Sequence, residues 1–429
     1  MIRRFLLVSG VLLIAIFLIA FLALMAVMDD PAPLDAPGVF QASPQQIEHG
    51  KYLVQIGNCM SCHTPQGGVP FAGGKAIGTP FGTVYSSNLT PDKATGLGGW
   101  SAAEFWRAMH HGRSKDGRLL YPAFPYTSYT HVSREDSDAI WAYLQTLAPV
   151  VQAPQRHALR FPYSTQAALA VWRALYFQPG SVATPNTVYA SPEQQRGAYL
   201  VNGVGHCAEC HSPRNALGAS VRGMSLSGGL MPAQNWYAPA LNNPQEAGLS
   251  HWSVQDAVAL LQTGVAPQAS VLGPMAEVVF GGTQFLSDAD ARAMVVYLQS
   301  LPAVAEPSPA AANSLELQVL LAPGGVLYRQ QCAACHGEQG QGQNGFPALA
   351  GNRAVVLRNP GNVIRLILQG GYLPATASNP QPLGMPPFLH VLNDQDIAAV
   401  STYIRNQWGN SAPAVSTMDV YRVRERRSF

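Results

Sequence analysis

Hydrophobic residues recur at the three- and four-residue spacing of a helix in three similar sets of segments along the chain. Each set opens with a short amphipathic segment. These opening segments cover residues 45–59, 193–207 and 323–335. A second helical segment follows a Gly- and Pro-rich loop, and it covers residues 104–112, 256–264 or 363–371. The third segment of each set is again amphipathic, and it covers residues 133–147, 286–301 or 392–408.

The ends of these segments carry helix boundary signals. Each second segment closes on glycine, which is favoured just past a helix C-terminus. Each third segment opens with Ser or Asn and acidic residues, which suit a helix N-terminus. No alternating strand pattern competes with the helical one. The sequence therefore predicts a mainly α chain of three small domains in tandem.

Domain boundaries follow from changes of composition. Residues 151–190 form a linker that contains a helix candidate with aromatic residues on more than one face, for which core packing is the default interpretation. Residues 303–318 are rich in Pro and Ala and indicate an exposed spacer. The predicted domains are residues 40–150, 191–302 and 319–409, with a basic tail over 410–429 for which solvation is the default interpretation.

All six cysteines lie in one motif, C-x-x-C-H, which occurs once at the start of each set. A zinc site needs further Cys or His ligands nearby, whereas these copies lie far apart in the sequence. A redox dithiol needs no histidine after its second cysteine, and here the histidine is present every time. Covalent attachment of haem needs all three residues, because two thiols bond the porphyrin and the histidine binds its iron. The motif thus predicts three haem c groups. Their attachment residues are Cys59, Cys62, Cys207, Cys210, Cys332 and Cys335, and the axial histidines are His63, His211 and His336.

A haem that only transfers electrons usually has a second axial ligand, and methionine opposite histidine raises its reduction potential. In the third set, "PLGMPPF" offers Met385 between Gly and Pro. In the second set, "VLGPMAEV" offers Met275 at a similar place. We therefore predict Met275 and Met385 as iron ligands.

The first set departs from this pattern, because "LYPAFPY" aligns Phe124 with Met385 through the proline that follows. Phenylalanine cannot bind iron. Either this haem has an open position, or another side chain replaces methionine. The substitutes are Met109, His110, His111 and His131.

The N-terminus predicts export from the cytoplasm. Arg3 and Arg4 precede an uncharged apolar run over residues 5–28, which is long enough to span a bilayer. We expect residues 1–30 to form a transmembrane anchor, with a cleaved signal peptide as the alternative. Both place the rest of the chain on the periplasmic side of a bacterial inner membrane, where haem c is attached.

Composition narrows the possible partners. The formal charge of +2 and the lack of a basic stripe argue against nucleic acid. Hydrophobic residues make up 47% of the chain and charged residues only 12%, about half the usual share, which suggests burial against a partner or a membrane. No Gly-rich dinucleotide motif or catalytic triad pattern is present, so no catalytic residue is predicted and substrate oxidation is assigned to another chain.

Four further stretches accompany the haem motifs: "NLTPDKATGLGGWSAAEFWRA", "LYPAFPYTSYT", "RGAYLVNGVGHCAECHSPRNALGA" and "WSVQDAVALLQTG". With them, the chain from about residue 40 to 408 resembles the triheme cytochrome c subunits of membrane-bound bacterial dehydrogenases of alcohols, gluconate, fructose and aldehydes. The resemblance implies three tandem cytochrome c-type domains that pass electrons from a catalytic subunit to ubiquinone. A flavoprotein is the first choice for that subunit, followed by a quinoprotein and a molybdoprotein. Members of the family usually have a cleaved signal peptide, so an anchor would be a departure.

Two other functions use the same chemistry. A free-standing multihaem enzyme, peroxidase-like or oxidising sulfur compounds, would use an open first haem. A terminal oxidase subunit would also carry anchored haem c, more often two groups than three.

Overall fold

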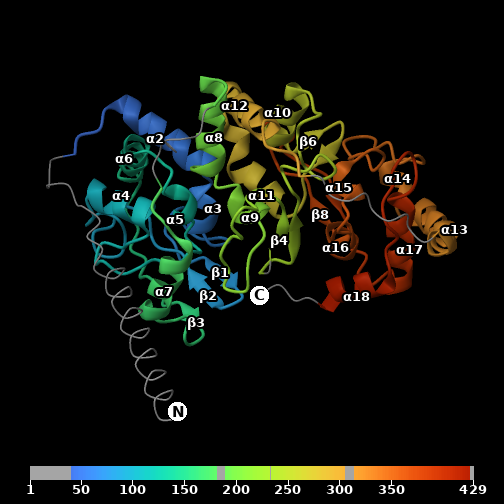
Figure 1. Ribbon diagram of the computed structural model, residues 1–429, viewed down its shortest axis with the longest axis horizontal. Helices are drawn as coiled ribbons and strands as arrows, with labels where there is room; N and C mark the ends of the chain where they lie inside the picture. Colours follow the sequence, from blue (N-terminus) through green and yellow to red (C-terminus); the bar gives the residue numbers. More distant parts are fainter. Residues whose placement is uncertain (1–39, 181–188, 232, 305–313, 426–429) are drawn as a thin grey trace, which may run out of the picture. The chain divides into compact units, whose positions relative to one another are not determined.

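The computed structural model describes residues 40–180, 189–231, 233–304 and 314–425 of the chain (Figure 1). The chain divides into two compact units, and each is described by itself. Unit 1 comprises Met1–Lys51 and His63–Pro185, and unit 2 comprises Tyr52–Cys62 and Asn186–Phe429. The division into three haem domains stays a prediction.

Unit 1 combines helices with one small sheet. Strands β1 (Ala76–Thr79), β2 (Gly82–Tyr85) and β3 (Ala158–Leu159) pair antiparallel in the order β1-β2-β3. Its helices are α4 (Ala102–His111), α5 (Tyr126–Tyr129), α6 (Arg134–Leu144) and α7 (Gln166–Tyr176). Helix α2 (Pro44–Ile56) and the short helix α3 (Cys59–His63) cross the boundaries between the units.

Unit 2 holds the second and third sets of segments. The second set comprises α8 (Pro192–Asn202), α9 (Ala208–His211), β4 (Gly229–Met231), β5 (Trp236–Ala238), α10 (Val254–Thr263), β6 (Val265–Ala266), β7 (Ala269–Ser270), α11 (Pro274–Gly281), η1 (Thr283–Phe285) and α12 (Asp288–Gln299). The third set comprises α13 (Ser314–Gln331), α14 (Ala333–His336), α15 (Arg353–Val356), α16 (Gly361–Gln369), β8 (Gly371–Tyr372), β9 (Gly384–Met385), α17 (Asp394–Ile404) and α18 (Thr417–Glu425).

The expected helices and their boundary residues are confirmed. Helices α4, α10 and α16 end at Gly112, Gly264 and Gly370, each with a positive φ that glycine adopts without steric cost. The third helix of each set begins behind a side-chain cap. Ser133, Ser287 and Asn393 each accept a hydrogen bond from a backbone N–H of the first turn. The chain is mainly helical, as predicted.

The first and last helices of each set cross at a glycine. Glycines 50, 197 and 324 face the backbone of Ala139, Ala293 and Ala399, respectively. A Cβ added to the glycine would lie 1.8, 1.9 or 2.3 Å from the facing carbonyl oxygen. The helices thus approach backbone to backbone, and the same contact recurs in all three sets.

Several elements differ from expectation. The strands are two to four residues long, too short to leave an alternating pattern. Helix α13 begins at Ser314, inside the expected spacer. The basic tail contains α18, which buries Val420 and pairs Arg424 with Asp394 at 2.7 Å. Helix α7 buries Leu169 and leaves other apolar residues exposed.

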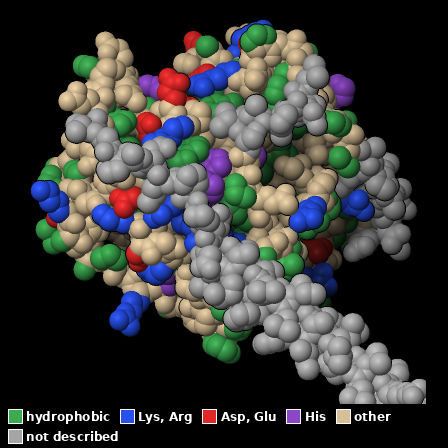
Figure 2. All heavy atoms as spheres, turned by 60° about the vertical axis from the view of Figure 1, so that its left-hand side comes forward, with side chains coloured by type: hydrophobic (Ala, Val, Ile, Leu, Met, Phe, Trp, Pro, Cys, Tyr) green, Lys and Arg blue, Asp and Glu red, His purple; other side chains and the backbone are tan. Residues whose placement is uncertain are grey.

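The predicted anchor over residues 1–30 lies outside the described residues. In the part of the chain that the structure describes, no helix is long and apolar enough to cross a membrane. On the face shown in Figure 2, Lys and Arg side chains are scattered among Asp and Glu and form no continuous stripe over the described residues.

Candidate functional site

Each C-x-x-C-H motif folds into one turn of helix. Helices α3, α9 and α14 contain or adjoin the three motifs. In the second and third motifs, the backbone N–H of the histidine donates to the backbone carbonyl of the first cysteine at 3.0 Å. This turn brings both thiols and the imidazole to one short segment. No two of the six cysteines are joined in a disulfide bond.

The three motif histidines share one hydrogen-bond arrangement. Their Nδ1 atoms lie 2.6 Å from the Ser87 carbonyl oxygen, 2.7 Å from that of Pro239 and 2.9 Å from that of Pro347, for His63, His211 and His336 respectively. Because a carbonyl oxygen only accepts, Nδ1 must carry the proton. This tautomer leaves Nε2 as the nitrogen that can bind a metal, and the carbonyl fixes the orientation of the ring.

Burial shifts the pKa of the histidines and cysteines of the motifs. It lowers the pKa of all three motif histidines, which keeps the imidazoles neutral, the form that binds iron. Burial raises the pKa of the Cys59 and Cys207 thiols to about 12 and that of Cys332 to about 11. Such thiols are protonated at neutral pH, unlike the low-pKa thiols of redox dithiols.

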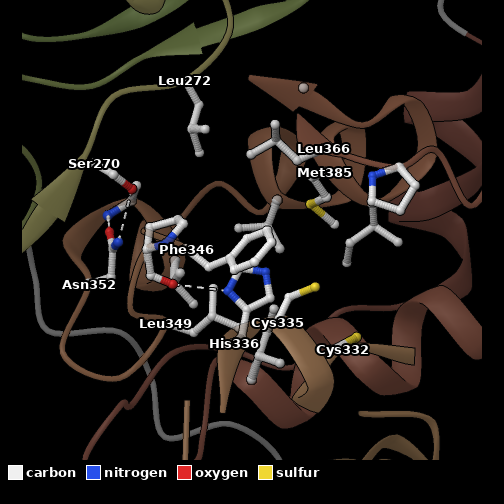
Figure 3. Close-up of a pocket in the computed structure, with 18 of the residues that line it drawn as sticks. Ser270, Leu272, Cys332, Cys335, His336, Phe346, Leu349, Asn352, Leu366 and Met385 are labelled. Carbon is white, nitrogen blue, oxygen red and sulfur yellow. Dashed lines mark hydrogen bonds between the residues drawn. The ribbon is translucent and has the colours of Figure 1, made fainter. Parts of the chain in front are cut away.

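The third motif opens into a cavity, which we call the third cavity after its motif (Figure 3). Cys332, Cys335, His336 and Met385 all line it, and the remaining lining is mostly apolar. The His336 ring and the Met385 side chain project into the same space, although they lie far apart in the sequence. The empty volume of about 1130 Å³ includes space that is open to solvent. The structure thus brings together every residue predicted for this site.

The third cavity has one wall that the sequence did not reveal. Ser270, the last residue of β7 in the second set, and Leu272, from the loop that follows, also line it. Asn352 holds this loop by donating a hydrogen bond to the Ser270 hydroxyl at 3.1 Å (Figure 3). Only the packing of the two sets against each other reveals this wall.

The second site has its predicted residues on separate elements. His211 ends α9, and Met275 is the second residue of α11, where it is half-buried. The assignment of Met275 as a ligand stays a prediction.

At the first site, Phe124 lies in the loop before α5, where its ring packs 5.4 Å from that of Tyr129. Met109 is buried in α4. The His110 Nε2 lies 2.9 Å from the Gly180 carbonyl oxygen, and His131 also packs against Gly180. His111, the last residue of α4, is half-buried.

The carbonyl partners of the motif histidines were not anticipated either. A sequence signal exists for two of them. Pro239 and Pro347 each begin a Pro-Ala-Leu triplet downstream of their motif, whereas Ser87 precedes Asn-Leu. A repeated triplet at this place marks a backbone carbonyl aimed at the motif histidine.

These observations fit a haem c group better than a protein-ligated metal. The described residues contain no group of three or more His, Cys, Asp or Glu side chains that could hold a metal ion. The third cavity instead offers two thiols, one imidazole with Nε2 available and one thioether within an apolar lining. These side chains would supply two attachment points for a porphyrin and two ligands for its iron.

Comparison with known proteins agrees with this chemistry. The cytochrome c family model matches residues 47–148 and 321–408. The cytochrome c subunit of the quinone alcohol dehydrogenase of Gluconobacter oxydans is 38% identical over 88% of this chain and 82% of its own length. The gluconate 2-dehydrogenase cytochrome c subunit of Pantoea cypripedii is 38% identical over 90% of this chain and 91% of its own length.

The fructose dehydrogenase cytochrome subunit of Gluconobacter japonicus is 35% identical over 90% of this chain and 84% of its own length. Cytochrome c domains imply covalently bound haem c. The chain therefore belongs to the family of cytochrome c subunits of bacterial alcohol, gluconate and fructose dehydrogenases.

Proposed function

We propose that this chain carries three covalently bound haem c groups and passes electrons from a dehydrogenase catalytic subunit to ubiquinone. The observation that carries the proposal is the Nδ1 hydrogen bond shared by all three motif histidines. One such bond is common for any buried histidine. Three bonds at the same position of three C-x-x-C-H motifs indicate one role, the presentation of Nε2 to iron.

The second haem would be held between His211 and Met275, and the third between His336 and Met385. The third cavity supports the latter pair, because both side chains line it. Haem iron accepts one electron at a time, so the group would supply a one-electron relay. The protein would set each reduction potential through axial ligands and burial.

One contact within unit 2 supports electron passage between the second and third sites. Ser270 and Leu272 line the third cavity, and the chain leads directly from them to Met275, the expected ligand of the second haem. A short segment of protein thus joins the second and third sites.

The names of the relatives support a dehydrogenase partner, because each is the cytochrome subunit of such a complex. We favour a flavoprotein as the catalytic chain, with a quinoprotein or molybdoprotein as alternatives, and a sugar, sugar acid, alcohol or aldehyde as substrate. The complex would lie on the periplasmic side of the bacterial inner membrane.

The proposal is tested by purifying the native complex in mild detergent, identifying the chains that copurify and their cofactors, and assaying ubiquinone reduction with a panel of sugars, sugar acids, alcohols and aldehydes. We expect a flavin-containing chain and substrate-driven quinone reduction. A chain that purifies alone and oxidises a small molecule by itself would contradict the proposal.

A further inference from the structure

After the second helix, the second and first sets each form a short antiparallel hairpin, which is one residue longer in the first set. After the glycine that ends α10, Val265 pairs with Ser270, and after the glycine that ends α4, Arg113 pairs with Leu119. Met275 and Phe124 each lie five residues beyond the second member of these pairs. Phe124 therefore occupies the position of Met275 in its own set.

The third set differs. There, Gly371 follows the glycine that ends α16 and pairs with Met385 itself. A shared proline aligns Phe124 with Met385 in the sequence, but the two residues differ in hairpin register. Phe124 and Met275 agree in hairpin register.

The helix register separates three of the other four candidates, all of which lie in α4. In α16, Val363, Leu366 and Ile367 line the third cavity, but Leu368 and Gln369 do not. Counted back from the closing glycine, Met109 in α4 corresponds to Ile367. His110 and His111 correspond to Leu368 and Gln369, which do not line the cavity. Met109 is therefore expected to line a side wall, on a different element from the loop that carries methionine in the other sets.

The contacts of His110 and His131 agree with this separation. The Nε2 atom of His110 is engaged by the Gly180 carbonyl at 2.9 Å. His131 packs so closely on the same residue that a Cβ added to Gly180 would lie 2.6 Å from its Cε1 atom. The Gly180 segment thus engages the His110 Nε2 and one edge of the His131 ring.

The loop around Phe124 is also firmly held. Tyr126, fully buried, packs against the glycine that ends α4, where an added Cβ would lie 2.7 Å from the tyrosine ring. The Tyr126 N–H donates to the Phe124 carbonyl at 2.7 Å. These contacts hold Phe124 to one place relative to the end of α4.

We propose that the first haem has only one axial ligand from the protein, His63, and that Phe124 takes the place of the missing methionine, so that small ligands bind at this haem alone. The inference rests on the proposed haem at the first motif. Loss of the thioether also predicts that the first haem has a lower reduction potential than the other two, because methionine opposite histidine raises the potential.

The test uses the full-length holoprotein in detergent, with haem per chain measured in every sample. Carbon monoxide is added to the dithionite-reduced protein, and the optical change is compared with the total haem. We expect about one third of the haem to bind carbon monoxide, and a matching high-spin ferric signal in the electron paramagnetic resonance spectrum of the oxidised protein.

Three variants make the test specific. Phe124→Met should abolish carbon monoxide binding and the high-spin signal, whereas the control Phe124→Leu, which cannot bind iron, should keep both. Met109→Leu should change neither. If the unsubstituted protein bound no carbon monoxide and the Met109→Leu variant did, Met109 would be the ligand and the inference would be overturned.

The remaining outcomes separate the inference from the proposed function. Three haems per chain without carbon monoxide binding would overturn the inference and leave the proposed function intact. Only two haems per chain, with the first motif empty, would overturn both. Unchanged carbon monoxide binding in a folded Phe124→Met protein would show that residue 124 does not face the iron.

Discussion

The glycine at the crossing of α8 and α12 gives a stability prediction that can be worked from the structure. A Cβ at residue 197 would lie 1.9 Å from the Ala293 carbonyl oxygen and 2.8 Å from the Tyr297 Cβ. Both are far inside van der Waals contact, and neither obstacle is the end of a flexible side chain. The two helices must therefore separate to accept Gly197→Ala.

Two effects of this substitution oppose each other. Replacing glycine by alanine inside a helix usually stabilises by about 0.5–1 kcal/mol. Overpacking a tight contact costs about 1–3 kcal/mol, and occasionally more. Because the contact is with backbone, we expect the cost to prevail and unit 2 to lose about 1–2 kcal/mol.

The matched control is Gln195→Ala, at an exposed position of the same helix, where alanine meets no such obstacle and a change within about 0.5 kcal/mol is expected. Denaturant unfolding of the two holoproteins, followed by circular dichroism, measures the difference. A Gly197→Ala protein as stable as, or more stable than, the Gln195→Ala control would refute the backbone-to-backbone crossing.

Three further predictions follow from the sites. Replacing Cys332 and Cys335 by alanine should remove one haem of three, measured as haem per chain, while the other two remain; an unchanged haem content would show that these thiols attach nothing. Gly281→Ala should displace the Asn58 side chain beside the first motif, because the added Cβ would lie 2.1 Å from the Asn58 Oδ1, which accepts a hydrogen bond from Ser61. We expect loss of this hydrogen bond to cost about 0.5–1.5 kcal/mol in denaturant unfolding, and a neutral effect would exclude this packing. Burial, and then Arg118, lowers the pKa of His157, whose Nδ1 accepts the Tyr85 N–H at 3.1 Å. As the pH falls, His157 therefore takes up a proton in the unfolded chain before it does so in the folded one, and the free energy of unfolding should fall below about pH 6.5. His157→Asn should reduce that fall, measured by unfolding at a series of pH values. Identical pH profiles of the two proteins would contradict the assignment.

The sequence was informative where local chemistry decides the structure. Periodicity located the three sets of helices, and their boundaries agree because a cap such as Ser133 or a closing residue such as Gly112 acts within one turn. The third site was also predictable, because Cys332, Cys335 and His336 share one turn and Met385 is flanked by Gly and Pro.

Features that depend on tertiary contacts could not be read in advance. Helix α18 has a strongly charged sequence, and its place depends on burying Val420 and on the ion pair between Arg424 and Asp394. The wall formed by Leu272 exists only because two sets pack together. The equivalence of Phe124 with Met275 required the hairpin register, since the sequence alone offered only a shared proline with Met385.

The most direct test of the account is the number of haem groups that remain bound to the chain after denaturation. The holoprotein is unfolded in acid and denaturant, and haem per chain is measured by its pyridine complex and by intact mass. Three C-x-x-C-H motifs predict three haems that survive unfolding, because thioether bonds hold them. Fewer than three retained haems, or haem that is released on unfolding, would contradict the central claim.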